Sequence, residues 1–206
     1  MKFHYYITGY GWAYLDVEFG DYKPEFPYAD AFCGGLEDLL KQIVSILEID
    51  ENFLLRSFDI YAENKLNWKI DEEGTHVEFD MAINEQKDKA IVNVIHHFYS
   101  EVDKECVYTG EINFNEFVNE VIISCDEILK EYGIIGYFNN SMDMVEFPIT
   151  YYLLIKNYLH RTMEKIEYVN KKFPHYNNGE ETDLFKTDID EELGLIKKMG
   201  TSFNKR

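Results

Sequence analysis

The sequence predicts an α+β fold in which an antiparallel β-meander of about six or seven strands is combined with one inserted helix and two or three C-terminal helices. Residues 3–28 and 54–99 mostly alternate apolar and polar side chains, which is typical of half-buried strands. Between them, residues 36–47 repeat apolar side chains at helical spacing, and a second helical repeat follows Asn113. A helix with strands on both sides in the sequence is expected to lay its apolar stripe on the sheet that those strands form.

The first segment predicts a β-hairpin, a short strand and a helix. Residues 3–8 and 13–19 alternate in polarity around the glycines of Gly9–Gly11, which favours a hairpin turn. Prolines limit residues 25–28 to a short edge strand, because proline has no backbone N–H. The apolar face expected for the following helix consists of Leu36, Leu39, Leu40, Ile43, Val44 and Leu47.

The middle of the chain predicts four further strands joined by short turns. They cover residues 54–60, 66–70, 77–83 and 90–99. The last run is apolar at odd and even positions alike, so we expect a strand that is covered on both faces or lies centrally in the sheet. Short connections favour antiparallel pairing, and hence a meander.

The C-terminal part predicts helices. Asn113 stands at an N-cap position with Glu116 three residues later, and the helical repeat that follows is expected to stop at Gly133. Another helix is expected from Pro148 to about Val169. We expect residues 1–173 to form a single domain, and residues 174–206 to form a polar linker with a short helix that adds little to stability.

Composition favours a soluble cytoplasmic protein. Hydrophobic residues make up 46% of the chain, yet no apolar run reaches the ~20 residues that span a bilayer. Residues 1–6 lack the apolar core of a signal peptide. Cys33, Cys106 and Cys125 are odd in number and show no paired spacing, which suits reduced thiols in a cytoplasm.

Negative charge is concentrated in the first three quarters of the chain. Residues 1–150 contain 30 acidic and 10 basic side chains, a net charge of −20, whereas residues 151–206 contain 9 and 10. Such a surface repels nucleic acids and anionic membranes and accelerates encounter with a basic protein. General solubility is the alternative explanation for this acidity.

We expect no catalytic residue, no metal site and no cofactor. His96 and His97 are adjacent on a predicted strand and therefore point to opposite faces, which prevents them from sharing one metal ion unaided. His4 and His76 lie at outward positions without ligand spacing. Cys125 lies on the apolar helical stripe, where a buried thiol behaves as a small hydrophobic side chain.

The most suggestive group of exposed candidates lies in the first hairpin, where aromatic side chains alternate with acids. An acidic surface with aromatic side chains suits a protein that binds a basic partner. The alternative is that these rings simply pack on the sheet. The predicted partner-binding residues are Trp12, Tyr14, Asp16, Glu18 and Asp21.

The residues Ile7-Thr8-Gly9-Tyr10-Gly11-Trp12-Ala13 and the acidic helix that follows resemble a group of uncharacterised bacterial proteins with a Gly-Trp-Ala hairpin. The small size, acidity and meander with flanking helices are also similar to the immunity proteins of polymorphic-toxin and contact-dependent inhibition systems. The second resemblance implies a cytoplasmic antitoxin that neutralises one cognate toxin by tight one-to-one binding. The net charge of residues 1–150 suits a basic partner, for example a nuclease-type toxin. Two alternatives stay open: an enzyme or small-ligand binder with a pocket between sheet and helices, and a structural or regulatory module.

Overall fold

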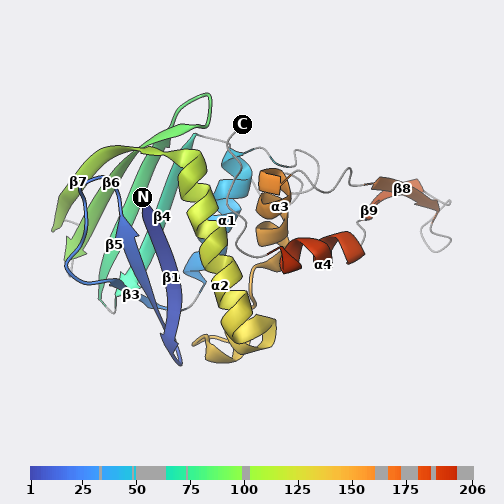
Figure 1. The fold of residues 1–206 in the computed structure, drawn as a ribbon, viewed down its shortest axis with the longest axis horizontal. Helices are drawn as coiled ribbons and strands as arrows, with labels where there is room; N and C mark the ends of the chain where they lie inside the picture. The colour runs from blue at the N-terminus through green and yellow to red at the C-terminus, as the bar shows by residue number, and fades with distance from the viewer. Residues whose placement is uncertain are drawn as a thin grey trace.

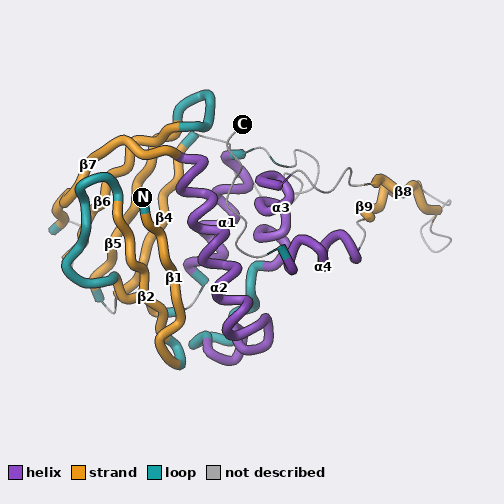
Figure 2. The backbone as a smooth tube through the Cα atoms, in the orientation of Figure 1, coloured by secondary structure: helices purple, strands orange, loops and turns teal. Residues whose placement is uncertain are grey.

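The computed structural model describes residues 1–32, 34–47, 49, 64–72, 74–98, 103–160, 167–172, 181–186 and 189–198. Within them, the chain forms a three-stranded sheet, a four-stranded sheet, a two-stranded pair and four helices (Figures 1 and 2). The strands are β1 (Lys2–Gly9), β2 (Trp12–Glu18), β3 (Tyr28–Ala31), β4 (Lys65–Glu72), β5 (Thr75–Ile83), β6 (Lys89–Phe98), β7 (Lys104–Asn113), β8 (Glu167–Lys172) and β9 (Glu181–Lys186). The helices are α1 (Gly35–Ile46), α2 (Phe114–Asn140), α3 (Ile149–His160) and α4 (Ile189–Lys197). The predicted α+β class is confirmed, as is the helix after the third strand.

The first sheet has the strand order β1-β2-β3, and all its pairs are antiparallel. The predicted hairpin is confirmed, and Gly11 in its turn has φ +77°, a left-handed conformation that glycine adopts without strain. The third strand lies at the sheet edge as predicted, but it begins at Tyr28 and not at residue 25. Pro27 supplies the reason, because it has no N–H for a strand ladder.

The second sheet is an antiparallel meander of β4, β5, β6 and β7 in sequence order. The strands predicted over residues 66–70, 77–83 and 90–99 correspond to β4, β5 and β6, whereas residues 54–60 lie outside the described residues. An internal position for β6 is confirmed, but cover on both faces is not, because Ile91 is 43% exposed. The sequence pattern missed β7, an edge strand with a single buried residue, Ile112, and hence without a clear alternation.

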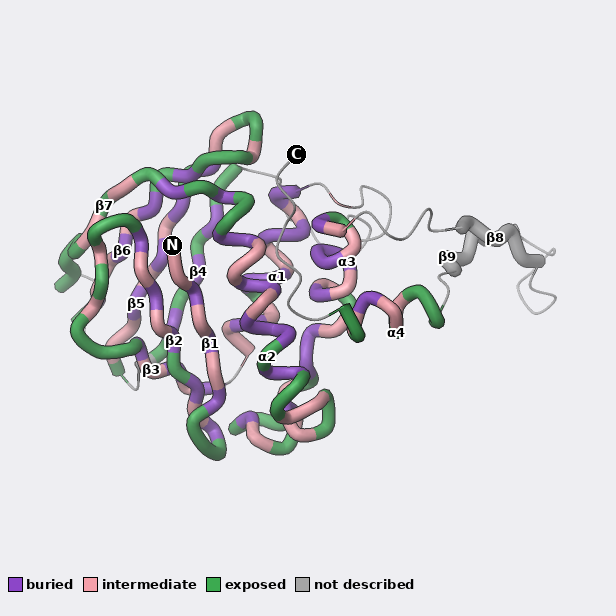
Figure 3. Tube along the Cα trace, in the orientation of Figure 1, coloured by how far each residue is buried: buried purple, intermediate pink, exposed green. Residues whose placement is uncertain are grey.

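The predicted strands divide between two sheets that pack against each other through their apolar faces. Aromatic rings meet across the interface: the ring centroids of Phe3 and Trp68 are 5.7 Å apart, and those of Phe19 and Phe79 are 6.3 Å apart. Along the strands, buried residues alternate with more exposed ones (Figure 3). Each sheet therefore has an inner face in the core and an outer face directed away from it.

Two helices lie beside the free edge of a neighbouring strand and hydrogen-bond to its backbone. The Ser124 hydroxyl of α2 donates to the carbonyl of Phe3 (3.0 Å) and accepts from the amide of Tyr5 (3.3 Å). The Gln42 side chain of α1 donates to the carbonyl of Asn67 (2.9 Å) and accepts from its amide (2.8 Å). These contacts satisfy edge groups of β1 and β4 that would otherwise be open to strand addition.

The long helix α2 begins and bends where the sequence marks it. The Asn113 side chain accepts a hydrogen bond from the Glu116 amide (3.0 Å), which confirms the predicted N-cap. At Gly133 the backbone is not helical (φ 67°, ψ 178°), but a helical segment resumes and continues to Asn140. The first helical segment therefore ends at Gly133 as predicted, but a second segment that was not predicted continues α2 beyond this kink. Among the helices of the described residues, none is both long and apolar enough to cross a lipid bilayer.

The C-terminal part differs from the prediction in two places. Helix α3 ends at His160, and Val169 lies in β8, so the helix expected up to Val169 is shorter. Strand β9 occupies Glu181–Lys186 of the segment that was predicted to be a linker. The short C-terminal helix is confirmed as α4, and its Leu195 is only 1% exposed, so this helix buries apolar surface next to α3.

A buried polar cluster joins α2 to α3. The Lys156 ammonium is 0% exposed and donates to the Asp126 carboxylate (2.5 Å) and to the Tyr152 hydroxyl (2.7 Å). The Tyr152 hydroxyl also donates to Asp126. Because each group in this cluster has a charged or polar partner, the ion pair can remain in the core and fix the position of α3 on α2.

Candidate functional site

The structure places four of the five predicted partner-binding residues together on the outer face of the first sheet. Trp12, Tyr14, Asp16 and Glu18 alternate along β2 with buried side chains, so all four project to the same side. Tyr14 is 37% exposed, which places its ring at the surface. Asp21 lies in the turn after β2, outside this row of residues.

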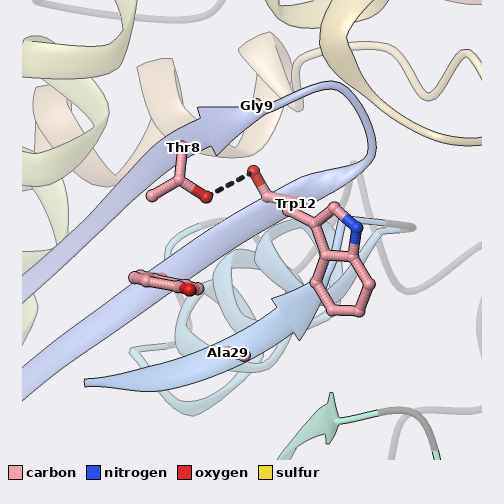
Figure 4. Close-up of a pocket in the computed structure, with 5 residues that line it drawn as sticks. Thr8, Gly9, Trp12 and Ala29 are labelled. Carbon is pink, nitrogen blue, oxygen red and sulfur yellow. Dashed lines mark hydrogen bonds between the residues drawn. The ribbon is translucent and has the colours of Figure 1, made fainter. Parts of the chain in front are cut away.

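A hollow of about 430 Å³ opens on this outer face at the turn of the β1–β2 hairpin (Figure 4). The indole of Trp12 lies at one side of it, and Ala29 of β3 at another (Figure 4). The Thr8 hydroxyl donates to the carbonyl of Trp12 (3.4 Å) across the hairpin. The residues that line the hollow are Thr8, Gly9, Trp12, Tyr14 and Ala29.

The acids of β2 are not free charges. Asp16 accepts a hydrogen bond from the ammonium of Lys2, and this contact raises the pKa of Lys2. Glu18 lies 2.6 Å from the ammonium of Lys23. The negative potential that the sequence predicts for this hairpin is therefore partly compensated within the chain.

Aromatic residues extend the same face across β1 to α2. The ring of His4 stacks on that of Tyr6 at a centroid distance of 4.7 Å, and Tyr6 meets the edge of Tyr14 at 6.0 Å. A second hollow of about 470 Å³ lies between β1 and α2. Its lining includes Glu127 and Glu131 of α2, and the His4 Nε2 atom lies 3.3 Å from the Glu127 carboxylate.

Helix α2 supplies further acidic side chains, which are also partly compensated: Glu127 lies 3.3 Å from His4, and Glu116 lies 3.5 Å from the N-terminal ammonium. Burial raises the pKa of Glu120, and the negative charges of Glu116 and Glu127 raise it further, whereas the N-terminal ammonium lowers it. Glu127 and Glu131 are exposed beside the second hollow, although Lys130 also lines it. We call the combined surface the aromatic–acidic face and define it as His4, Tyr6, Trp12, Tyr14, Asp16, Glu120, Glu127 and Glu131.

The outer face of the second sheet carries a different group, which we call the histidine cluster: His76, Glu78 and His97. One ring nitrogen of each histidine and one carboxylate oxygen of Glu78 lie within 4.8 Å of one another. The Nε2 atom of His97 is 2.7 Å from Glu78, and the two imidazole rings stack at 4.0 Å. Among the described residues, these are the His, Cys, Asp and Glu side chains that could together hold a metal ion.

The electrostatics of the histidine cluster favour ionised Glu78 and neutral His76. Burial alone would raise the pKa of Glu78, but hydrogen bonds from Asn67 and His97 outweigh it and lower this pKa. Burial lowers the pKa of His76, and the neighbouring His97 lowers it further.

Strand register explains why the sequence pattern alone did not bring these residues together. His96 and His97 do point to opposite faces: His96 bonds to the Tyr28 hydroxyl (3.0 Å), whereas His97 lies opposite His76 on the outer face. The sequence feature that could have predicted this contact is the turn between Ile83 and Ala90, which pair across it. Counting along both strands away from Ile83 and Ala90 brings His76 opposite His97.

Comparisons of the chain with models of known protein families, with curated proteins and with solved structures find no match.

Proposed function

We propose that this chain is a non-enzymatic protein-binding module, most concretely a cytoplasmic immunity-type inhibitor that neutralises a basic toxin by tight binding. The observation that carries the proposal is the aromatic–acidic face, where exposed rings from two strands lie beside acids of a neighbouring helix. Aromatic side chains are common energetic anchors of protein interfaces, and charge complementarity steers the partner toward them.

In this proposal, the aromatic and the acidic residues of the aromatic–acidic face have different roles in binding. Trp12 and Tyr14 border a hollow that an inserted side chain of the partner can fill, which is the arrangement of an anchor pocket. Glu127 and Glu131 offer carboxylates that lysine or arginine side chains can approach from solvent. The aromatic part would supply affinity, and the acidic part would supply association rate and choice of partner.

A nuclease-type toxin fits the charge of this chain. The substrate cleft of a nuclease must be positive to hold phosphates, so an acidic protein can occupy or overhang it. The net charge of −20 over residues 1–150 provides long-range attraction to such a cleft and repulsion from the nucleic acid itself.

A small-molecule site is the second candidate, because the hollow beside Glu127 lies between β1 and α2 and matches the expectation of a pocket between sheet and helices. We rank it second because the His4 and Glu127 side chains on its rim are 39% and 57% exposed. Small-molecule sites usually enclose most of their ligand.

The test starts from a partner obtained by pull-down from the native host or by co-expression with the neighbouring gene product. The double variant Glu127→Lys/Glu131→Lys should lower the association rate constant at least about 10-fold at low salt and flatten its dependence on ionic strength. Stopped-flow mixing at several salt concentrations measures both effects.

The matched control is Glu85→Lys/Glu105→Lys, which makes the same charge change at exposed positions of the second sheet and its β5–β6 turn. Its association rate should fall much less. The proposal fails if both double variants behave alike, or if the purified chain turns over a small molecule without needing a protein partner.

A further inference from the structure

Cross-strand geometry gives the histidine cluster the layout of a metal site. His76 and Glu78 are two residues apart on β5, so both side chains project to the same face. His97 lies directly opposite His76 on β6, which puts a third donor on that face from the neighbouring strand. Two donors from one strand and one from its neighbour converge without any loop having to order around an ion.

The β5–β6 turn holds this register through side-chain hydrogen bonds. The side-chain oxygen of Asn84, Oδ1, accepts from the backbone amides of Asp88 (3.1 Å) and Lys89 (3.2 Å). Its side-chain nitrogen, Nδ2, donates to the Asp88 carboxylate (2.6 Å). A slip of one residue in this hairpin would turn the two histidines to different faces. The donor set is therefore fixed by the fold.

One nitrogen atom of the histidine cluster has no hydrogen-bond partner and is a candidate metal ligand. It is the buried Nε2 atom of His76. The buried Nδ1 atom of His97 is also without a partner, but the nitrogen of that ring that faces Glu78 is Nε2. Buried polar nitrogens are normally paired, and a metal ion can take up a lone pair that no protein donor reaches.

We propose that His76, Glu78 and His97 form a binding site for a divalent transition metal ion, with Zn²⁺ as the best match. Imidazole nitrogen and carboxylate oxygen are both common zinc ligands, and three protein ligands leave one tetrahedral position for water. The site lies on the second sheet, apart from the aromatic–acidic face, and does not depend on a protein partner.

Binding requires at least one of the two stacked imidazole rings to rotate, because a nitrogen lone pair lies in the plane of its ring and the two rings are nearly parallel at a centroid distance of 4.0 Å. The donors lie within 4.8 Å of one another, and two ligands of one zinc ion are about 3.3 Å apart when each bond is ~2.0–2.2 Å. Where His97 donates its Nε2 proton to Glu78 Oε2, zinc would bind Nε2 only after that proton has moved to Nδ1, so the imidazole stays neutral. Asn67 donates to the other oxygen of Glu78, Oε1, and so holds the carboxylate in place for coordination.

Two lysine residues on the neighbouring strands oppose the binding of a cation at this site. Lys69 lies opposite Glu78 on β4 and Lys104 lies opposite His97 on β7, and both ammonium groups oppose a cation at this point. Asp71 lies opposite His76 and acts in the favourable direction. With a single carboxylate among three ligands, we expect Zn²⁺ or Co²⁺ to bind and Mg²⁺ or Ca²⁺, which prefer oxygen ligands, not to bind.

The experiment is a titration of the metal-free 206-residue chain with Zn²⁺ in a calorimeter, and with Co²⁺ while visible absorption is recorded. We expect one equivalent to bind and Co²⁺ to develop the absorption of a tetrahedral site. Glu78→Gln and His76→Asn should each lower the affinity at least about 10-fold. Both positions are only partly buried, so we expect each variant to fold. Circular dichroism checks that it does.

The matched control is the pair His4 and Glu127, a histidine and a carboxylate 3.3 Å apart on β1 and α2, which belong to no group of three candidate metal ligands among the described residues. His4→Asn should leave the Zn²⁺ isotherm unchanged. The inference is overturned if the wild-type chain binds no stoichiometric Zn²⁺, if Glu78→Gln binds it as well as wild type, or if His4→Asn removes the binding.

Discussion

The two sheets bury the same kind of surface and expose different kinds. Their inner faces meet through aromatic rings such as Phe19 and Phe79. Their outer faces diverge: the β1–β3 sheet presents Trp12 and Tyr14 beside the acids of α2, whereas the β4–β7 sheet presents the histidine cluster. Because the inner faces are committed to packing, the outer faces are where this fold can differ in function.

The acids of β2 and those of α2 also differ in their electrostatic surroundings. Acids on β2 neutralise lysines of the chain itself, so they contribute less to an external field than the sequence suggests. On α2, burial raises the pKa of Glu120, and the neighbouring charges of Glu116 and Glu127 raise it further. The aromatic rings and the negative potential thus come from different elements that the fold brings side by side.

The largest expected effect concerns the inner face. Phe79 is 1% exposed and its ring meets Trp68, Phe19 and Tyr28, so Phe79→Ala should lower the free energy of unfolding by about 3–5 kcal/mol. Tyr14→Ala on the outer face should lower it by less than about 1.5 kcal/mol, since it loses one ring contact. Urea melts of both variants measure the contrast, and equal losses would mean that Tyr14 belongs to the core.

The next largest effect concerns the pH dependence of stability at the contact between the two sheets. There, Asp30 of β3 accepts hydrogen bonds from the Tyr5 hydroxyl and the Asp71 backbone. Burial raises the pKa of Asp30 to about 6, against 3.8 in the unfolded chain. Between these values the folded state keeps a proton that the unfolded chain has released. The stabilising contribution of Asp30 should therefore fall by about 2 kcal/mol as the pH rises from 4 to 7.

Urea melts of wild type and Asp30→Asn at pH 4, 5, 6 and 7 check this sign, because the asparagine does not titrate. The wild-type free energy of unfolding minus that of Asp30→Asn should decrease with rising pH. Asp38→Asn, at an exposed carboxyl in the first turn of α1, controls for the removal of one charge. A difference that increases with pH would mean that Asp30 is ionised in the folded protein at low pH.

Much of the fold could be predicted because its strongest signals are local. Asn113 caps α2, the alternation over β5 marks its inner face, and the repeat over α1 marks its stripe. Strand β7 could not be predicted because it lies at a sheet edge, where few side chains are buried. The end of α3 was misplaced because the apolar residues after His160 fit a strand as well as a helix.

The candidate site could be predicted only within single elements. Trp12, Tyr14 and Asp16 share one strand, so their spacing predicts their common face. The contribution of Glu127 depends on α2 lying along β1, which is a tertiary contact with no local pattern. The histidine cluster depends on strand register, which the sequence contains but which becomes visible only once the turn is located.

The central claim is that the partner binds the outer face of the first sheet and not that of the second. Tyr14 and Ile91 allow a matched test, because they are 37% and 43% exposed and lie on outer faces of different sheets. Calorimetric titration of the purified partner should show that Tyr14→Arg weakens binding about 100-fold, through loss of an aromatic anchor and addition of a positive charge. Ile91→Arg should change the dissociation constant less than about threefold. Loss of binding in Ile91→Arg with Tyr14→Arg unaffected would contradict the claim and move the interface to the second sheet.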